Sequence, residues 1–192
     1  MNAETKQILG LPAAEAAPLV LGMFLFVEGV GGRIVEVEAY SEDDPASHSH
    51  GGPKGRNLPM FLAGGHIYVY RSYGVHWCMN LVTGPNGRGE AVLLRALEPT
   101  SGLDQMRKRR PGIRDERLCA GPGNLTLALG VDGSMTGLPL GGQIKLEPGA
   151  RADGVWVGPR IGISVSVDAP LRFCLGESRS LSRKHLKSAR PM

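Results

Sequence analysis

The sequence predicts a single domain of the mixed α+β class. Its 192 residues suit one hydrophobic core, and neither an internal repeat nor a linker divides them. The 28 glycines and 14 prolines indicate short elements joined by frequent turns. Segments in which apolar and polar residues alternate, as in strands, are interspersed with short segments of helical character.

The N-terminal third predicts a short helix and then a β-hairpin. Residues 12–18 (PAAEAAP) form one or two helical turns that end at the second proline. The first strand is 19–29, the turn falls at Val30–Gly32, and the second strand is 33–40 (RIVEVEAY). Residues 41–66 show no periodic pattern, and a loop of this length inside a compact domain is often functional.

The remainder of the chain predicts further strands and two helices. Residues 66–83 form two strands that turn at Tyr73-Gly74, and 91–98 (AVLLRALE) forms another. A helix over 101–110 has Ser101 as its N-cap and a basic last turn that suits the helix dipole. A short helix follows Gly121-Pro122, and three strands lie near QIKLEP, VWVGPRIGIS and LRFCLG.

The composition restricts the class of protein. A net charge of +4 is a mild indication of a polyanionic partner. Cys78, Cys119 and Cys174 have no CxxC spacing, which argues against a disulfide framework and favours a reducing compartment. No apolar run reaches 18 residues, and the N-terminus lacks the pattern of a signal peptide. We therefore expect a cytoplasmic protein with no membrane partner.

Several common catalytic motifs are absent from the sequence. GGPKGRN (51–57) lacks the spacing of a phosphate-binding loop, and no serine has the paired glycines of a nucleophile elbow. The H-x-E and P-C-x-x-C pattern of zinc deaminases is missing as well. His48 and His50 could supply two metal ligands, but no third stands at a useful spacing, so we expect no metal site.

The segment 33–40 carries the main functional signal. From Val35 onward it alternates strictly, so that Glu36, Glu38 and Tyr40 share one face of a strand. A solvated sheet face accounts for such a pattern more often than a catalytic site does. The position of the other tyrosines favours a site.

Three of the four tyrosines in the chain are Tyr68, Tyr70 and Tyr73, and the fourth is Tyr40. Aromatic rings hold planar bases by stacking, and a carboxylate can activate water against a glycosidic carbon. Tyrosines, carboxylates and a polar loop with His48 suit this chemistry.

Eight blocks in the same order resemble the alkyladenine (3-methyladenine) DNA glycosylase family. They cover about residues 20–178 and read RIVEVEAY, ASHSHGG, GRNLPMF, IYVYRSYG, HWCMN, AVLLRALEP, RLCAGPGNL and PLRFCLG. We expect one domain over 1–192, with a core at about 18–178 and a basic tail, 179–192, that frays. The resemblance implies a curved, mostly antiparallel β-sheet flanked by short helices, with a β-hairpin that enters DNA.

The resemblance assigns catalytic roles to Glu38 and Arg95. Glu38 matches the glutamate that deprotonates the attacking water, and Arg95 matches the arginine that holds this water. Glu36 lies on the same strand face, but the match to the general base falls on Glu38. Without the resemblance, Arg95 would be interpreted as a strand arginine paired with a surface carboxylate.

The resemblance also assigns residues that bind the base and the DNA. Tyr40, His48 and Tyr70 match the residues that sandwich a nucleotide rotated out of the duplex. Tyr73 matches the side chain that fills the gap in the duplex, although an exposed tyrosine at a turn can also be a plain surface residue. Asn80 matches the residue at the pocket floor that screens purines.

The expected activity is therefore that of a monofunctional DNA glycosylase of base excision repair. The substrates are 3-methyladenine, 7-methylguanine, hypoxanthine and ethenoadenine in double-stranded DNA, and the protein acts as a monomer without a cofactor. Cutting the strand as well requires an amine, and between residues 33 and 98 the only lysine is Lys54, in the loop.

Two alternatives stay open on the sequence. One is a non-catalytic nucleic-acid-binding module, in which tyrosines stack on bases and acidic residues only solubilise the protein. Glu38 separates the two, because a binder of a polyanion has no use for a carboxylate in its site. The other is a formyltransferase-like β-domain, which fits the fold but not the eight blocks.

Overall fold

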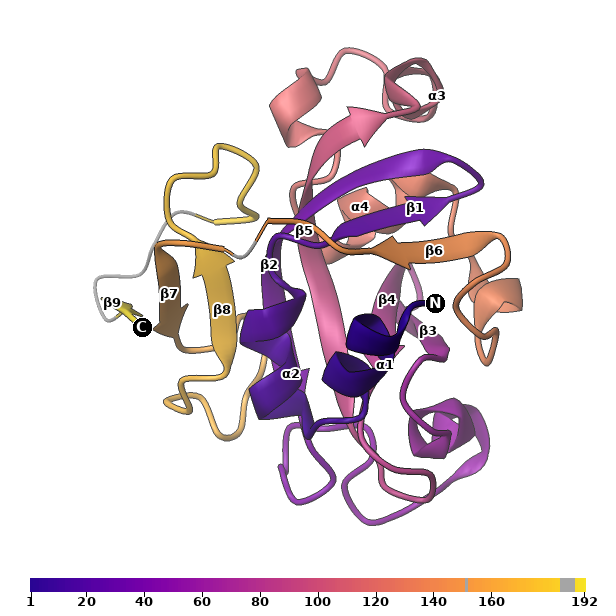
Figure 1. Ribbon diagram of the computed structural model, residues 1–192, viewed down its shortest axis with the longest axis vertical. Coiled ribbons are helices and arrows are strands. Elements are labelled where there is room, and N and C mark those ends of the chain that lie inside the picture. Colours follow the sequence, from indigo (N-terminus) through magenta and orange to yellow (C-terminus); the bar gives the residue numbers. More distant parts are fainter. Residues whose placement is uncertain (151, 184–188) are drawn as a thin grey trace.

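An open antiparallel β-sheet forms the centre of the protein (Figure 1). The computed structural model describes residues 1–150, 152–183 and 189–192. The main path of the sheet has the order β3-β4-β5-β2-β8-β7-β9, and β1 pairs with both β2 and β6. The α+β class and the mostly antiparallel sheet expected from the sequence are confirmed.

The elements are short, apart from two long central strands. The strands are β1 (Phe24–Val27), β2 (Val30–Tyr40), β3 (Ile67–Ser72), β4 (His76–Val82), β5 (Ala91–Ser101), β6 (Ile144–Glu147), β7 (Val155–Gly158), β8 (Arg172–Leu175) and β9 (Arg190–Pro191). The helices are α1 (Ala3–Leu9), α2 (Ala13–Val20), α3 (Leu103–Arg109) and α4 (Pro122–Leu129), with 3₁₀ segments η1 (Gly55–Phe61), η2 (Asp115–Arg117) and η3 (Gly133–Met135).

The two long strands β2 and β5 pair along their length and carry the site. Their register shifts on both sides of Glu36, which marks a bulge in β2. Val35, Val37 and Ala39 are buried in the core against α2, so Glu36 and Glu38 lie on the other face. Both glutamates are fully buried, which excludes a solvated face.

The first hairpin turns earlier than expected. Val27 pairs with Val30, so the turn is Glu28-Gly29, and both residues have positive φ, 50° and 82°. Gly31 and Gly32 lie inside β2 instead. A Cβ on Gly32 would stand 1.9 Å from the carbonyl oxygen of Glu98, so glycine is needed there for close strand approach.

Other boundaries differ from the expected ones because tertiary contacts extend or shorten the elements. The helix predicted over 12–18 runs on to Val20, and the following strand starts only at Phe24. α1 was not predicted, although Asn2 caps it by accepting the Thr5 amide at 2.8 Å. Ser101 ends β5 and is not an N-cap.

The C-terminal region also departs from the prediction. The strand expected in VWVGPRIGIS ends at Gly158, and residues 159–168 form a loop against the site. The tail does not fray directly after residue 178, since Ser180 and Leu181 are buried. The predicted fraying also covers 184–188, which lie outside the described residues.

Candidate active site

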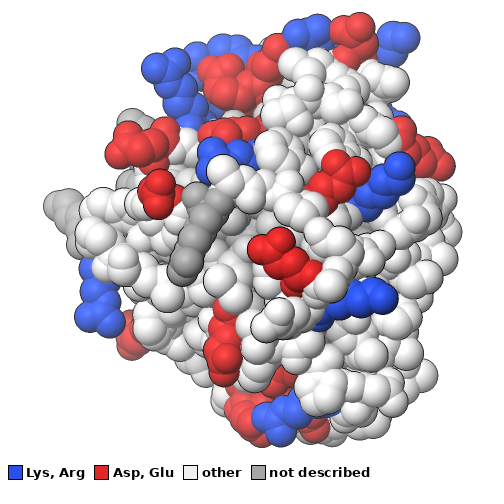
Figure 2. All heavy atoms as spheres, viewed as in Figure 1, with Lys and Arg blue, Asp and Glu red and all other residues white. Residues whose placement is uncertain are grey.

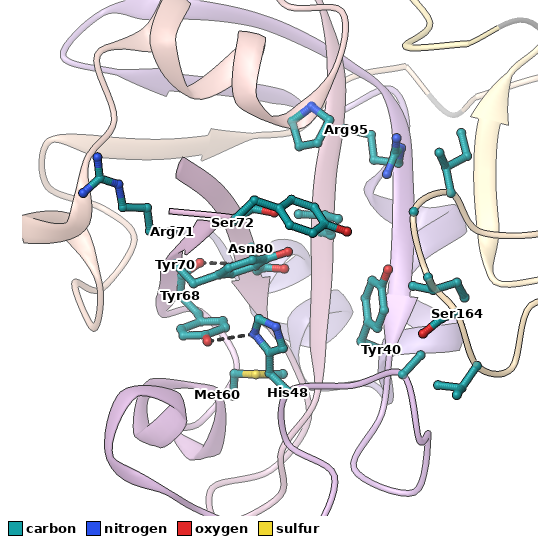
Figure 3. Close-up of a pocket in the computed structure, with 18 of the residues that line it drawn as sticks. Tyr40, His48, Met60, Tyr68, Tyr70, Arg71, Ser72, Asn80, Arg95 and Ser164 are labelled. Carbon is teal, nitrogen blue, oxygen red and sulfur yellow. Dashed lines mark hydrogen bonds between the residues drawn. The ribbon is translucent and has the colours of Figure 1, made fainter. Parts of the chain in front are cut away.

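Tyr40, at the end of β2, lies at one side of a cleft of about 590 Å³ (Figure 3). This volume is within the range of about 300–1,000 Å³ that is typical of small-molecule sites. Strands β2 to β5, the loop 41–66 and the loop 159–168 all contribute to its walls. Residues far apart in the sequence therefore meet around one cavity.

One wall of the cleft is a cluster of three aromatic rings from β3 and the preceding loop. Tyr68 and Tyr70 stack with ring centroids 5.6 Å apart, because alternate residues of a strand share a face. His48 lies edge-on to Tyr70 at 4.4 Å, and its Nδ1 is 3.0 Å from the Tyr68 hydroxyl. Tyr40 stands across the cleft from these rings.

The protonation states of the aromatic side chains suit stacking. Desolvation in the cleft and the positive charge of Arg56 both lower the pKa of His48, so the imidazole is neutral at physiological pH. Burial, and then the negative charge of Glu38, raise the pKa of Tyr40, so its hydroxyl remains a donor. The side chains of His48 and Tyr40 that line the cleft are therefore both uncharged.

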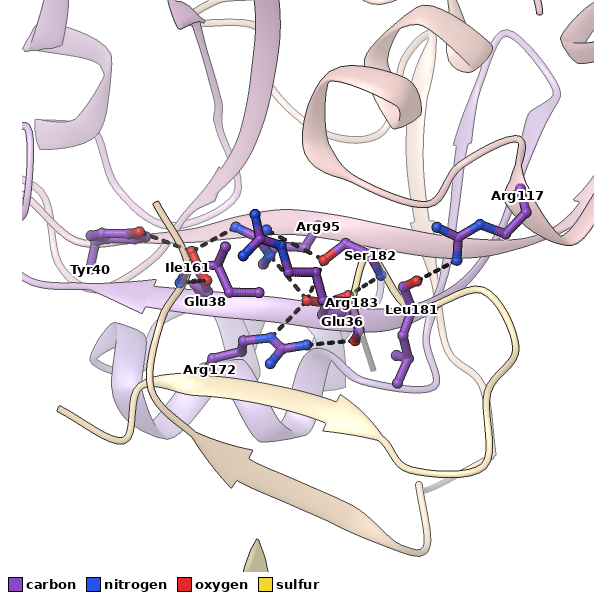
Figure 4. Close-up of polar contacts among 10 residues, drawn as sticks. All are labelled: Glu36, Glu38, Tyr40, Arg95, Arg117, Ile161, Arg172, Leu181, Ser182 and Arg183. Carbon is purple, nitrogen blue, oxygen red and sulfur yellow. Dashed lines mark hydrogen bonds and ion pairs between the residues drawn. The ribbon is translucent and has the colours of Figure 1, made fainter. Parts of the chain in front are cut away.

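Glu38 lies directly behind the cleft lining, and three donors contact its carboxylate (Figure 4). The Tyr40 hydroxyl donates to Oε2 at 2.9 Å, and the backbone amide of Ile161 donates to Oε1 at 2.8 Å. The Nη1 atom of Arg95 is 3.1 Å from Oε2. Tyr40, Arg95 and Ile161 all line the cleft, so Glu38 sits beneath its floor.

Arg95 connects Glu38 to a second buried carboxylate, that of Glu36 (Figure 4). Glu36 accepts from Arg95 Nε at 3.1 Å, from Arg172 Nε at 2.8 Å and from the Ser182 amide at 2.6 Å. Burial alone would raise the pKa of Glu36, but Arg172, Arg95 and Ser182 together lower it. Glu36 is therefore ionised and saturated with donors.

Asn80 and Tyr73 both line the cleft but differ widely in their exposure. Asn80 is 4% exposed and donates from Nδ2 to the Tyr68 carbonyl at 2.9 Å, which holds its amide in place. Tyr73 is 90% exposed at the tip of the β3–β4 hairpin, with a positive φ of 50°. One residue thus stands in the interior and the other at the mouth.

The structure places the seven candidate residues around one cavity. Tyr40, His48, Tyr70, Tyr73, Asn80 and Arg95 line it, and Glu38 lies beneath it. The sequence did not single out Ile161, Arg172 or Ser182. Alternation along a strand locates side chains on one face, but these residues reach the site from distant segments, so no local pattern reports them.

The two histidines of the 41–66 loop have separate surroundings. His48 contacts the tyrosines, whereas His50 is exposed and its Nδ1 is 3.3 Å from the Glu42 carbonyl. Among the described residues, no group of three or more His, Cys, Asp or Glu side chains is arranged to hold a metal ion. No helix in the described ranges is long and apolar enough to span a membrane.

The fold and the site define a class of protein with an aromatic-walled cleft of ligand-binding size above a buried carboxylate. Residues 7–179 match the family model described as methylpurine-DNA glycosylase. The chain belongs to the methylpurine-DNA glycosylase family. It is accordingly a DNA repair enzyme, a hydrolase that acts on N-glycosyl bonds.

Curated bacterial proteins are similar over nearly the whole chain. A protein of Nitrosospira multiformis is 51% identical over 173 residues, which cover 89% of each chain. One from Rhodopseudomonas palustris is 51% identical, covering 88% of this chain and 82% of its own. One from Agrobacterium fabrum is 47% identical, covering 90% and 88%. All three carry the name "putative 3-methyladenine DNA glycosylase".

Proposed function

We propose that this protein is a monofunctional glycosylase that rotates a damaged purine out of duplex DNA and hydrolyses its N-glycosyl bond. The observation that carries the proposal is the aromatic cleft between Tyr40 and the His48–Tyr70 pair, with Glu38 beneath it. The product is an abasic site. The substrates are the alkylated or deaminated purines 3-methyladenine, 7-methylguanine, hypoxanthine and ethenoadenine, and the protein acts as a monomer.

The cleft selects a flipped purine by stacking it between Tyr40 and the His48–Tyr70 pair. A target atom within the base stack is unreachable, so the nucleotide must leave the duplex. Stacking on an aromatic ring contributes about 1–3 kcal/mol per base. A methylated purine that carries positive charge gains a further ~0.5–2 kcal/mol over an aromatic face. The neutral imidazole of His48 avoids repelling such a base.

Glu38 supplies the chemistry. The transition state resembles an oxocarbenium ion, so an ionised carboxylate both stabilises the sugar and takes a proton from the attacking water. The Arg95 guanidinium and the Ile161 amide both contact this carboxylate and fix its orientation. The Tyr40 hydroxyl ties the stacking ring to the same oxygen atom that Arg95 contacts.

The position of Lys54, the only lysine between residues 33 and 98, fits a mechanism that hydrolyses the N-glycosyl bond without cutting the strand. A glycosylase that cuts the strand forms a Schiff base through an amine. Lys54 precedes η1 and is not among the described residues that line the cleft.

Tyr73, at the exposed hairpin tip, fills the gap that the flipped nucleotide leaves.

The direct test is excision from duplexes that each carry one lesion, followed by alkaline cleavage at abasic sites. Wild-type protein is expected to cleave at the lesion, and Glu38→Gln to lose about 10²–10⁴-fold in single-turnover rate. Glu38→Gln should still bind lesion-bearing duplex in a gel-shift assay. Glu98→Gln, on the neighbouring strand and partly exposed, is the matched control and should excise normally. Wild-type excision by Glu38→Gln would exclude its role as the base.

A further inference from the structure

Arg160 is a buried arginine directly behind Tyr40. Its side chain is 0% exposed, and its guanidinium carbon lies 4.5 Å from the centre of the Tyr40 ring. Arg160 does not line the cleft, whereas Tyr40 does. The guanidinium therefore occupies one face of the ring, and the cleft lies on the other.

The hydrogen bonds of Arg160 leave part of its guanidinium directed at this ring. Nη1 donates to the Ala39 carbonyl at 3.0 Å and also pairs with the Asp44 carboxylate. The Nε and Nη2 atoms are buried and have no hydrogen-bond partner among the described residues. A buried cation without further acceptors gains most from the electron-rich face of an aromatic ring.

Asp44 balances this charge only in part. Burial raises the pKa of Asp44, but the hydrogen bond from Arg160 and the backbone hydrogen bond from Ala46 lower it overall, so the carboxylate is ionised. The charge of Arg160 still acts at Tyr40, where it opposes the increase in pKa caused by burial and Glu38. The ring thus lies in a positive field from its far side.

We propose that Arg160 is a specificity-determining residue, which weakens the attraction of Tyr40 for cationic bases and shifts the enzyme towards neutral ones. The π electrons of one ring attract a cation from either face, and a cation bound on one face opposes a second on the other. A neutral base such as hypoxanthine stacks on the ring without this repulsion. The inference rests on the proposed function, since it concerns the base in the same cleft.

The test compares 7-methylguanine, which is cationic, with hypoxanthine in identical duplexes under single-turnover conditions. The quantity measured is the ratio of the two excision rates, relative to that of wild-type protein, so intrinsic bond lability cancels. Asp44→Asn leaves Arg160 uncompensated and should lower the ratio by about three- to tenfold. The double variant Arg160→Met with Asp44→Asn removes both charges and should raise it by a similar factor.

The control is Asp43→Asn, an exposed neighbour whose partner is Arg88, and it should leave the ratio unchanged. If Arg160 only positions Tyr40, the variants will slow both substrates by the same factor, and this result overturns the inference. Circular dichroism checks folding, and Arg160→Gln with Asp44→Asn replaces the double variant if that one unfolds.

A second readout separates this inference from the proposed function. The same substitutions can be made in Glu38→Gln protein, and binding to the two lesion duplexes can then be measured. The ratio of affinity for 7-methylguanine to affinity for hypoxanthine should fall with Asp44→Asn and rise with the double variant. If wild-type protein excises neither base, the proposed function is wrong, but the affinity ratio still tests Arg160. An unchanged affinity ratio in both variants overturns the inference whether or not the enzyme excises.

Discussion

Glu36 and Glu38 lie two residues apart on one face of β2, yet their surroundings give them different tasks. The two oxygens of Glu36 accept from Arg172 Nε and from the amide and hydroxyl of Ser182, and Arg95 Nε adds a fourth donor. Glu38 instead contacts residues that line the cleft. Glu36 therefore joins β2, β5, β8 and the C-terminal segment, whereas Glu38 is the carboxylate that we propose for the chemistry.

Glu36→Gln should reduce the free energy of unfolding at pH 7 by about 3–5 kcal/mol, because it leaves two buried arginines without their shared anion. The arginines and Ser182 lower the folded-state pKa of Glu36 below its ordinary value of 4.5. The contribution of ionised Glu36 to folding stability is therefore complete above pH 4.5. It is lost as the pH falls through the folded-state pKa.

Urea unfolding at several pH values measures both effects. As the pH is lowered, the free energy of unfolding should fall less in Glu36→Gln than in wild-type protein. Glu98→Gln, whose partner Arg33 is 4.0 Å away and partly exposed, should change stability by less than about 0.5 kcal/mol. Identical acid profiles for wild type and Glu36→Gln would contradict the role of Glu36 as an ionised anchor.

Asn80→Ser should increase excision of guanine, above all of mispaired guanine, which flips easily. Guanine carries a 2-amino group that hypoxanthine lacks, and the Asn80 amide, held by the Tyr68 carbonyl, is not free to move aside. A steric conflict and an unmatched donor at this amino group should disfavour guanine in the cleft by about 1–3 kcal/mol. Single-turnover excision of guanine, with 3-methyladenine as the unaffected control, measures it. No gain on any guanine substrate by a folded variant would argue against this role.

At the level of elements, the β3–β4 hairpin carries both a wall and the rim of the cleft. Tyr68 and Tyr70 face inward from β3, while the turn lifts Tyr73 to the surface. Tyr73 and Gly74 both have positive φ, which makes the tip tight and projects the tyrosine away from the sheet. A wedge that enters DNA has to stand on such a projecting tip.

Tyr73→Ala should weaken binding to lesion-bearing duplex more than to undamaged duplex. As the proposed wedge, Tyr73 would stabilise only the flipped state, in which unstacking costs a few kcal/mol per base step. Fluorescence anisotropy with the two duplexes measures the difference, and Tyr73→Leu, which keeps an apolar wedge, is the control. Equal losses on both duplexes would instead make Tyr73 a general surface contact.

At the level of the whole molecule, charge is distributed unevenly between faces. The face that carries α1 and α2 mixes acidic and basic side chains and is largely uncharged (Figure 2). The cleft, by contrast, is lined by Arg56, Arg71 and Arg95, with no acidic residue among the described ones that border it. We therefore expect the phosphate backbone of DNA to bind along the cleft.

Affinity for duplex DNA should therefore fall steeply as salt increases, with a log–log slope of about 0.9 per neutralised phosphate. Arg56→Ala and Arg71→Ala should each reduce this slope by about 1. Arg107→Ala, whose partners are Asp104 and Asp115 on and after α3, is the matched control.

Excision activity should be unaffected by EDTA. Loss of activity in EDTA and its recovery with zinc would contradict a metal-free mechanism.

Local sequence was sufficient for most of the elements and for the faces of the strands. The alternation over 35–40 places Glu36, Glu38 and Tyr40 together, because successive side chains of a strand point to opposite sides. The turn at Tyr73-Gly74 follows in the same way from the conformational freedom of glycine. The first hairpin was mispredicted because glycines serve both turns and close strand contacts, which sequence alone does not distinguish.

Burial and charge pairing were decided only by tertiary structure. Arg172 reaches Glu36 across 136 positions and Arg160 reaches Asp44 across 116, so no local pattern indicates either pair. The same long-range packing turns 159–168, predicted in part as a strand, into a loop that binds Glu38. The physical reason is that backbone geometry acts over a few residues, whereas the desolvation that makes a buried charge need its partner depends on the whole fold.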